Sequence, residues 1–364
     1  MTISQTTERL RVLHVISGDL WAGAEVQAYT LISYLQPFCD LQVVVLNEGK
    51  LSESLRDRGI NVLVFDESAS SSLSILFKLR RSMLAFKPDI VHTHREKENV
   101  LGAIANLLAT RAKSIRTVHG DIEVSANWKT MLQQKIDQFV GNHLQNALIS
   151  VTHDLKSKLE KDYQAENIHV IHNGISLESS SQGNAFADFK RLAPDTKHIG
   201  IIGRLVPVKR IDIFLQIASL LSNENIQFHI IGDGPLSGSL QELTKNLNLE
   251  DCVTFHGFRG DVPTCIRSLD AVIICSDHEG LPMTALETIA SGNTLIAHAI
   301  GGLVELTEYS NLILVQQNSA EAYAQAIRST LSSSMPTPKK HFKHTSERNG
   351  EETLLLYQEL AITP

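Results

Sequence analysis

Residues 203–210, Gly-Arg-Leu-Val-Pro-Val-Lys-Arg, combine basic side chains with glycine in a pattern that suits anion binding. The segment follows an apolar run and precedes a helical pattern. Glycine lets the backbone turn closely, so Arg204 and Lys209 project from the end of the preceding strand. A forked guanidinium and a compact ammonium beside a helix start suit a diphosphate. Taken alone, the segment fits a solvated basic turn equally well.

Residues 277–287, Asp-His-Glu-Gly-Leu-Pro-Met-Thr-Ala-Leu-Glu, form a second and more informative segment. It also follows an apolar run and continues into a helical pattern, and Pro282 suits the first helical position. The backbone amides of Leu281, Met283 and Thr284 would then point out of the helix start, where anions bind.

Two carboxylates flank this predicted helix start. Glu279 lies in the loop before the helix, and Glu287 lies about one and a half turns inside it. So placed, they can accept hydrogen bonds from hydroxyls at opposite ends of a long ligand. The alternative is a helix-start acid and an ordinary exposed glutamate. That alternative is weak for Glu287, because Ala285, Leu286 and Ile289 predict a largely covered helix.

Both segments belong to a chain in which short apolar runs alternate with longer helical patterns. The near-continuous apolar character of the runs is typical of strands buried on both faces, and the alternation predicts parallel, doubly wound sheets. We predict strands at 12–17, 41–46, 61–65, 89–93, 114–118, 147–151, 168–171, 198–202, 227–231, 253–256, 271–275, 294–297 and 312–315. We predict helices at 24–35, 74–86, 97–109, 128–143, 153–162, 210–221, 236–247, 282–291, 320–331 and 351–360.

The alternation breaks twice, which predicts two α/β domains facing one cleft. We place an N-terminal domain at 1–178, a linker at 179–195 and a second domain at 196–345. The last segment, 346–364, has no core of its own, so we expect its helix to pack back on the N-terminal domain. A cleft between two such domains is a preferred place for a small-molecule site.

Composition excludes several classes of protein. Hydrophobic residues make up 43% of the 364 residues and charged residues 20%, as in globular proteins. A net charge of −7 disfavours a nucleic-acid partner. The four cysteines are far apart and favour a reducing compartment. Without a signal-peptide pattern or an apolar run of about 20 residues, we expect a cytoplasmic protein that is soluble or peripheral.

The two segments together, Gly-Arg-Leu-x-Pro-x-Lys and Glu-Gly-Leu-Pro-x-x-x-x-Glu, resemble the retaining glycosyltransferases of family 4, which have the GT-B fold of two Rossmann-like domains. The resemblance covers most of the chain. Further matching segments, in the same order, are 22–25, 89–94, 117–120, 172–175, 231–236, 256–258 and 301–305. It implies transfer of a sugar from a nucleotide-diphosphate donor, with UDP as our guess, to a saccharide or lipid-linked acceptor in cell-surface polysaccharide or glycolipid synthesis.

The resemblance also implies how the second domain would bind the donor. Arg204 and Lys209 would neutralise the diphosphate and stabilise the leaving group. Glu287 would bind the ribose hydroxyls, Glu279 would bind a hydroxyl of the transferred sugar, and the helix-start amides would face the donor. Phe258 and neighbouring Arg259 would bracket the base.

On the acceptor side, the resemblance assigns two residues of the N-terminal domain. Gly23 would bring backbone close to the phosphates, and His119 would contact the sugar near the reacting carbon. Departures from the family pattern include Ala22 in place of a second glycine and Ser176 in place of an aspartate. Residues 293–294 and 309–312 also depart, and these two changes could alter how the sugar is held.

We expect neither a metal nor a cofactor. His92 and His94 share one face of a strand end, but no cluster of acidic or cysteine ligands accompanies them in the sequence. Asp-x-Asp, the metal-binding device of the other large glycosyltransferase fold, is absent from the sequence. We therefore predict that no divalent cation is required.

Three alternatives stay open at this point. Residues 232–238 superficially match a dinucleotide fingerprint, but the last glycine comes one position late, so an NAD-dependent oxidoreductase is a weak competitor. A sugar-nucleotide epimerase shares the architecture and the phosphate ligands. A catalytically silent nucleotide-sugar-binding protein has no need of all the proposed site residues.

Residues 74–87 suggest a further partner. Lys78, Arg80, Arg81 and Lys87 alternate there with apolar side chains, a pattern found in helices that lie on anionic membranes. A domain helix with a solvated basic face is the commoner explanation. Peripheral contact with the inner face of the membrane is therefore an alternative rather than an expectation.

Overall fold

The computed structural model describes residues 9–120, 128–177, 195–332 and 342–362. The chain divides into two compact units, one formed by Met1–Ile175 with His344–Pro364 and the other by Ser176–Lys343. Most of the segment predicted as a linker lies outside the described residues.

The first unit contains a seven-stranded parallel sheet in the order β3-β2-β1-β4-β5-β6-β7. Its strands are β1 (Arg11–Ile16), β2 (Asp40–Val45), β3 (Asn61–Val64), β4 (Ile90–Thr93), β5 (Lys113–Val118), β6 (Ala147–Ser150) and β7 (Ile168–Val170). Its helices are α1 (Gly23–Leu35), α2 (Lys50–Asp57), α3 (Ser72–Phe86), α4 (Glu96–Leu107), α5 (Trp128–His143), α6 (His153–Leu159), the 3-10 turn η1 (Ala165–Asn167) and α13 (Ser346–Ile362).

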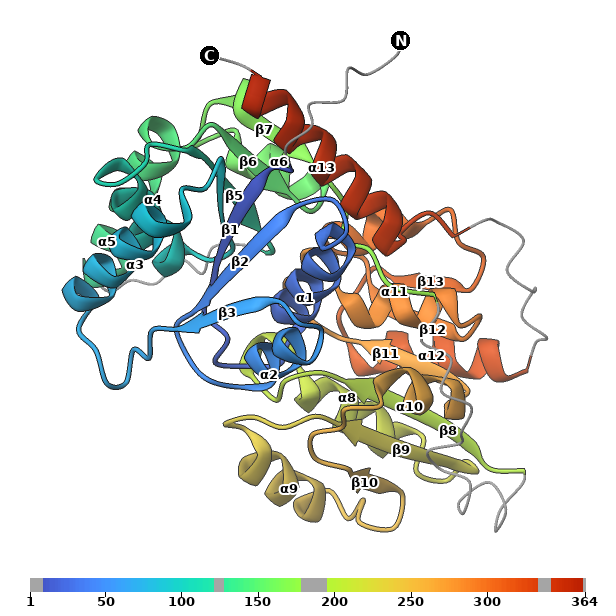
Figure 1. The fold of residues 1–364 in the computed structure, drawn as a ribbon. Helices are drawn as coiled ribbons and strands as arrows, with labels where there is room; N and C mark the ends of the chain where they lie inside the picture. Colours follow the sequence, from blue (N-terminus) through green and yellow to red (C-terminus); the bar gives the residue numbers. More distant parts are fainter. Residues whose placement is uncertain (1–8, 121–127, 178–194, 333–341, 363–364) are drawn as a thin grey trace. The chain divides into compact units, whose positions relative to one another are not determined.

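Both faces of this sheet are covered, as Figure 1 shows. Side chains of a strand alternate between the faces, so Val12 and Leu13 enter different cores. Val12 packs with α1 and α13, whereas Leu13 packs with α3 and α4. Burial on both faces explains why the strands are apolar throughout, and it confirms the predicted doubly wound arrangement.

The C-terminal helix α13 is part of this first unit. It packs against α1, and Tyr357 is fully buried in the core beneath it. Gly350 makes the close approach possible, because a Cβ there would lie 2.0 Å from the ring of Tyr34. The helix begins at Ser346, five residues before the predicted start at Glu351, because the polar first turn docks through Asn349 on the carbonyl of His172.

The second unit contains a six-stranded parallel sheet in the order β10-β9-β8-β11-β12-β13. Its strands are β8 (Lys197–Ile202), β9 (Ile226–Ile231), β10 (Val253–Phe255), β11 (Ala271–Ile274), β12 (Thr294–His298) and β13 (Leu312–Val315). Its helices are α8 (Ile211–Leu220), α9 (Ser237–Asn246), α10 (Val262–Ser268), α11 (Met283–Ala290) and α12 (Ala320–Leu331), with 3-10 turns η2 (Pro207–Lys209) and η3 (Gly301–Leu306).

Two short helices escaped prediction from the sequence. α2 has eight residues and α10 has seven, too few for a helical period to stand out from the surrounding loop. Within the described residues, no helix has both the length and the apolar character that a bilayer-spanning helix requires.

Candidate functional site

In the second unit, the predicted donor-binding segments follow two neighbouring strands. β8 and β11 lie side by side, and the sheet grows outward from them in opposite directions. The loops that leave the carboxyl ends of two such neighbouring strands run in opposite directions and leave a crevice between them. Ligands of doubly wound sheets bind in this crevice. The backbone amide of Asp277, after β11, donates to the carbonyl of Val208, after β8, at 2.9 Å.

Two glycines let these loops approach each other. Gly203 directly follows β8 with φ 154°, and Gly232 directly follows β9 with φ 142°. A Cβ on Gly232 would lie only 1.9 Å from the carbonyl oxygen of Gly203, so no other residue fits without moving backbone. Gly232 therefore serves to pack the loop after β9 against the loop after β8. Segment 232–238 does not begin a helix at its first glycine, as a dinucleotide fingerprint does, because α9 begins only at Ser237.

The predicted phosphate ligands differ in their surroundings. Lys209 lies 2.6 Å from Glu279, and Ser276 donates a second hydrogen bond of 2.6 Å to the same carboxylate oxygen. The structure therefore pairs two residues that the resemblance to family 4 assigned to different parts of the donor. Arg204 is exposed, and no carboxylate of the described residues lies within ion-pair distance of it. Its charge is available to a ligand.

Arg210 holds the two loops together and was not singled out from the sequence. Its guanidinium pairs with Asp212 at 2.9 Å and with Asp277 at 3.1 Å. Asn318 donates a further hydrogen bond to Asp277. Both acids are visible in the sequence, but only the adjacency of β8 and β11 shows that one arginine bridges them.

Helix α11 begins one residue later than predicted. Pro282 is its N-cap, with extended backbone angles (φ −71°, ψ 131°), and Met283 is its first residue. The first turn of a helix has no acceptors for its backbone amides, so the amides that follow Pro282 are directed out of the helix start. Met283 and Thr284 carry such amides, and buried Leu281 anchors the loop that precedes them.

A second glycine contact holds Glu279. Gly301 has φ 52°, and a Cβ there would lie 2.0 Å from the carbonyl oxygen of Glu279. The amide of Gly302 donates to the carbonyl of Gly280 at 3.0 Å. The backbone that carries Glu279 is therefore supported from the loop after β12.

Glu287 is half-buried on α11, among the buried side chains of Met283, Leu286 and Ile289. Burial raises its pKa from 4.5 to about 7, because the charged carboxylate loses hydration there. Because its pKa lies near neutral pH, the carboxyl group changes readily to its ionised form when a ligand donates hydrogen bonds to it.

The predicted base-binding residues lie on the loop after β10. Phe258 is 60% exposed, which is unusual for so large an apolar ring. Arg259 forms a two-pronged ion pair with Asp261, with contacts of 2.8 and 2.7 Å. This loop joins the others because the amide of Gly232 donates to the carbonyl of Gly257 at 2.8 Å.

In the first unit, β1 and β4 form the corresponding pair of neighbouring strands. Gly23 is exposed and begins α1, just after β1. Arg95, after β4, pairs with the buried Glu25 of α1 at 2.5 Å and with Asp19 at 3.5 Å. Arg95 and Glu25 were not predicted as site residues, since their pairing depends on strand order.

His119 follows β5 and is half-buried. Burial, reinforced by the charges of Arg95 and Arg116, lowers its pKa to about 3. The imidazole is therefore neutral throughout the physiological range, so it serves as a hydrogen-bonding group rather than a cation. Its Nε2 lies 3.3 Å from Nδ1 of His94.

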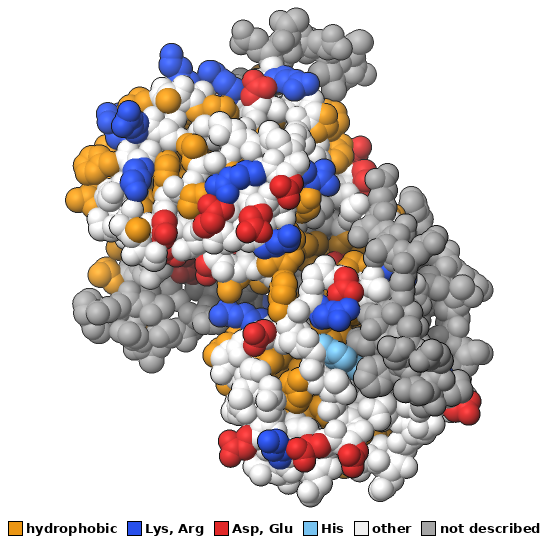
Figure 2. Space-filling model, turned by 60° about the horizontal axis from the view of Figure 1, so that its bottom comes forward, with side chains coloured by type: hydrophobic (Ala, Val, Ile, Leu, Met, Phe, Trp, Pro, Cys, Tyr) orange, Lys and Arg blue, Asp and Glu red, His pale blue; other side chains and the backbone are white. Residues whose placement is uncertain are grey.

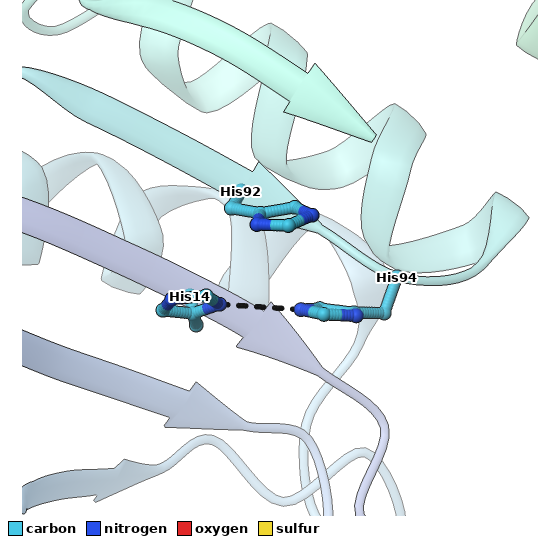
Figure 3. Close-up of side chains that lie close together, drawn as sticks. All are labelled: His14, His92 and His94. Carbon is cyan, nitrogen blue, oxygen red and sulfur yellow. Dashed lines mark hydrogen bonds between the residues drawn. The ribbon is translucent and has the colours of Figure 1, made fainter. Parts of the chain in front are cut away.

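His94 belongs to a buried cluster with His14 and His92, shown in Figure 3. The ring nitrogens of these three residues lie close enough together to ligate one metal ion. His14, expected to be a core residue, is fully buried. Both ring nitrogens of His92 are engaged, Nδ1 with the hydroxyl of Tyr357 at 2.5 Å and Nε2 with that of Thr117 at 2.7 Å.

Two hollows in the described part of the chain differ in how they relate to the predicted site residues. A hollow of about 640 Å³ in the first unit is lined by α6, β7 and α13 and contains no predicted site residue. One of about 580 Å³ in the second unit is lined partly by Val208, Arg210 and Asp277, beside the donor-binding loops. On the face drawn in Figure 2, basic and acidic side chains are interspersed.

Comparison with known proteins identifies the family. The model of Glycosyltransferase Family 4 matches residues 21–179, and that of Glycosyl transferases group 1 matches residues 184–348. The chain belongs to glycosyltransferase family 4. The glycosyltransferase is 26% identical over 347 residues to the UDP-Gal:alpha-D-GlcNAc-diphosphoundecaprenol alpha-1,3-galactosyltransferase of Escherichia coli, covering 89% of each chain. It is 24% identical over 323 residues to the lipopolysaccharide core biosynthesis glycosyltransferase LpsD of Rhizobium meliloti, covering 88% of this chain and 87% of that one.

Solved structures confirm the fold. Anabaena Alr3699/HepE, crystallised with UDP-glucose, matches with a TM-score of 0.79 at 19% identity, over 98% of this chain and 99% of its own. TarM of S. aureus matches with a TM-score of 0.71 at 12% identity, over 97% and 100%. The glycosyltransferase therefore has the GT-B fold. Family models that match both halves favour glycosyl transfer over the epimerase and oxidoreductase alternatives.

Proposed function

We propose that this glycosyltransferase transfers a hexose or N-acetylhexosamine, with retention of configuration, from a UDP-sugar to a saccharide or lipid-linked acceptor. The acceptor would serve cell-surface polysaccharide or glycolipid synthesis. The observation that carries the donor assignment is the convergence of Arg204, Lys209, Glu279 and the start of α11 on loops after β8 and β11. A galactosyltransferase and a lipopolysaccharide core enzyme among its relatives support the class of acceptor.

The charges of the second unit suit a pyrophosphate. Arg204 has no competing carboxylate among the described residues, so it donates to the phosphates directly. Lys209 is already oriented by Glu279, and its remaining N–H groups are left for phosphate oxygens. As the bond to the sugar breaks, negative charge grows on the leaving diphosphate, and both cations stabilise it more strongly than in the ground state.

The remaining donor contacts follow from position along α11 and the β10 loop. The amides of Leu281, Met283 and Thr284 face the anionic donor at the positive end of the helix. Glu287 accepts hydrogen bonds from the ribose hydroxyls, and Glu279 accepts one from the transferred sugar. Phe258 stacks on the base, while Arg259 is positioned by Asp261 at its edge.

In the first unit, Gly23 offers the first amide of α1 to the donor phosphates. His119 offers a neutral imidazole to the sugar near the reacting carbon. In this proposal the leaving phosphate itself activates the acceptor hydroxyl, and no divalent cation takes part. The positive charge that stabilises the leaving diphosphate then comes only from side chains of the protein.

A panel of sugar nucleotides tests this proposal. UDP-sugars should raise the melting temperature of the protein more than GDP-, ADP- or CMP-sugars, and NAD should leave it unchanged. Product analysis should then show the sugar on an acceptor, because an epimerase would leave an altered sugar on the nucleotide. Stabilisation by none of the sugar nucleotides, or an epimerised donor as the only product, would refute the function.

A second proposal concerns the membrane. Helices α3, α4 and α5 pack side by side, and each exposes large apolar side chains, among them Leu73, Phe77, Leu107, Leu108, Met131 and Phe139. The exposed charged side chains described on α3 and α5 are basic, although the whole chain has a net charge of −7. The only acid on α5, Asp137, is buried and paired with Arg116. Apolar and basic groups together suit an anionic lipid surface.

Vesicle sedimentation tests membrane contact. The protein should sediment with vesicles containing phosphatidylglycerol and remain in solution with pure phosphatidylcholine, and salt should weaken the binding. Phe77→Ser and Phe139→Ser should reduce sedimentation several-fold. Leu355→Ser is the matched control, because Leu355 is similarly exposed but lies on α13. Equal loss in all three variants, or no binding by the wild type, would contradict the proposal.

A further inference from the structure

Three histidines of the first unit form a continuous hydrogen-bonded row that ends at the predicted sugar-contacting residue. Nδ1 of His14 lies 3.2 Å from Nε2 of His94, and Nδ1 of His94 lies 3.3 Å from Nε2 of His119. Figure 3 shows the first of these bonds. His14 and His94 are buried in the core of the unit, so no water-exposed path replaces these contacts.

The row follows from strand register. His14 of β1 pairs with His92 of β4, and side chains two residues apart point to the same face of a sheet. His92 and His94, and likewise Thr117 and His119 on the next strand, therefore share the face that α13 covers. The result is a polar patch at the carboxyl end of an otherwise apolar face.

All three rings are neutral, because burial lowers the pKa of His14 and His119 to about 3 and that of His94 well below its ordinary value. A neutral imidazole has one N–H and one lone pair. The two hydrogen bonds must therefore run in the same direction along the row. Either every ring carries its proton on Nδ1, or every ring carries it on Nε2.

The two ends of the row decide between these directions. Nε2 of His14 and Nδ1 of His119 are buried and have no hydrogen-bond partner in the described part of the chain. A buried N–H without an acceptor is rarer than a buried acceptor without a donor. A proton on Nε2 of His14 would remain unpaired in the core, whereas His119 is only half-buried, so a proton on its Nδ1 lies nearer to the surface from which a ligand oxygen approaches.

We propose that His14 and His94 are positioning residues that hold His119 in its Nδ1–H tautomer, so that His119 donates a hydrogen bond to an oxygen of the transferred sugar. The tautomer itself is a property of the protein without ligand. Only the contact with the sugar rests on the function proposed above.

His92 supports the row from the side. Its ring stacks on that of His94, with centroids 4.5 Å apart, and its own nitrogens are bound to Tyr357 and Thr117. Both ring nitrogens of His92 and both of His94 are engaged, so a metal ion bound by these two residues and His14 would have to break one bond of His92 and one bond of the row at His94. The arrangement therefore favours a proton-ordered row over a metal centre.

The experiment reads the tautomers directly. Full-length protein labelled with ¹⁵N-histidine is studied by long-range ¹H–¹⁵N correlation, which distinguishes protonated from unprotonated ring nitrogens. Signals are assigned by loss in single variants. In the wild type, His14, His94 and His119 should all show Nδ1–H. In His94→Phe, the signals of His119 should shift toward Nε2–H or a mixture.

Matched variants distinguish an effect of the hydrogen bonds on the tautomer of His119 from an effect of side-chain packing alone. His14→Asn keeps an amide donor where Nδ1 lies and should preserve the tautomer of His119, whereas His14→Phe should not. His229→Phe breaks a row of the same length, His198–His229–His256, in the second unit and should leave His119 unchanged. With an accepted UDP-sugar, His14→Phe should lower kcat about ten-fold at unchanged KM, the cost of one misdirected hydrogen bond.

Three results would overturn the inference: Nε2–H at His119 in the wild type, an unchanged tautomer in both His94→Phe and His14→Phe, or a stoichiometric metal on His92 and His94 in the purified protein. The wild-type spectrum decides even if a variant fails to fold. Absence of any transferase activity would refute the proposed function while leaving the tautomer measurement intact.

Discussion

Replacing Glu287 by Gln should change how the stability of the enzyme depends on pH. The folded-state pKa of Glu287 is about 7, against an ordinary value of 4.5. Between these pH values the folded protein binds more protons than the unfolded chain, so stability falls as pH rises through this window and levels off above pH 7. Glutamine mimics the neutral carboxyl group and removes that dependence.

The size of the effect follows from 1.36 kcal/mol for each pH unit that separates the two pKa values. Full ionisation of Glu287 therefore costs about 3 kcal/mol above pH 7, against about 1 kcal/mol at pH 5. The cost of ionisation at these two pH values differs by about 2 kcal/mol. Because part of the side chain is exposed, solvent screening lowers this difference to about 1–2 kcal/mol. The free energy of unfolding of Glu287→Gln, measured relative to wild type, should therefore rise by that amount between pH 5 and pH 8.

Urea unfolding at pH 5, 6, 7 and 8 measures this change. Glu321→Gln is the control, because Glu321 is exposed on α12 and its replacement should leave the pH profile unchanged. If wild type and Glu287→Gln lose stability in parallel from pH 5 to pH 8, the carboxyl group titrates normally and the argument from burial is wrong.

The same variant tests the role of Glu287 in donor binding. If ribose hydroxyls donate to its carboxylate, binding of a UDP-sugar favours the ionised form and releases a proton below pH 7. Calorimetry in two buffers of different ionisation enthalpy should detect that proton at pH 6 and lose it in Glu287→Gln. Identical binding enthalpies in both buffers for the wild type would place the ribose elsewhere.

Further outcomes are expected elsewhere in the molecule. Arg204→Ala and Lys209→Ala each remove a charge-assisted hydrogen bond of roughly 1.5–3 kcal/mol, so initial rates of transfer should fall about ten- to a hundred-fold, and wild-type rates would contradict the assignment. Asp137→Ala leaves a buried guanidinium unpaired and should lower the free energy of unfolding by about 3–5 kcal/mol in urea titrations. Gly301→Ala forces a Cβ onto a backbone carbonyl at a φ of 52° and should reduce transfer at least ten-fold, whereas Gly238→Ala, with open space around it, should not. Transfer should persist in EDTA, and a loss that manganese restores would show that a cation is required.

Much of the fold was predictable from local pattern. Strands buried on both faces must be apolar throughout, so β1, β4, β8 and β11 stand out in the sequence. The chemistry-bearing segments directly follow such strands, so residue order alone places them at the carboxyl edge of a parallel sheet. The helices α2 and α10 were not predicted, because they are too short to show a helical period in the sequence. The exact start of α11 after Pro282 was not predictable from the period either.

Pairings between distant residues were not predictable in the same way. Lys209 and Glu279 are 70 residues apart, as are Glu25 and Arg95, and each pair meets only because the order of strands brings two loops together. Gly301 supports Glu279 for the same reason. A sequence shows which side chains are available at each strand end, but not which strands are neighbours.

The amino-acid sequence by itself determined the chemical groups, the parallel sheets and the family, because these depend on residue type, period and spacing along the chain. Tertiary structure alone decided the protonation of Glu287 and the direction of the row from His14 to His119. Both depend on loss of water and on contacts across strands. Burial and strand register are properties of the assembled sheet. Burial shifts the pKa of Glu287 toward neutrality, and register gives the histidine row its defined hydrogen-bond donor.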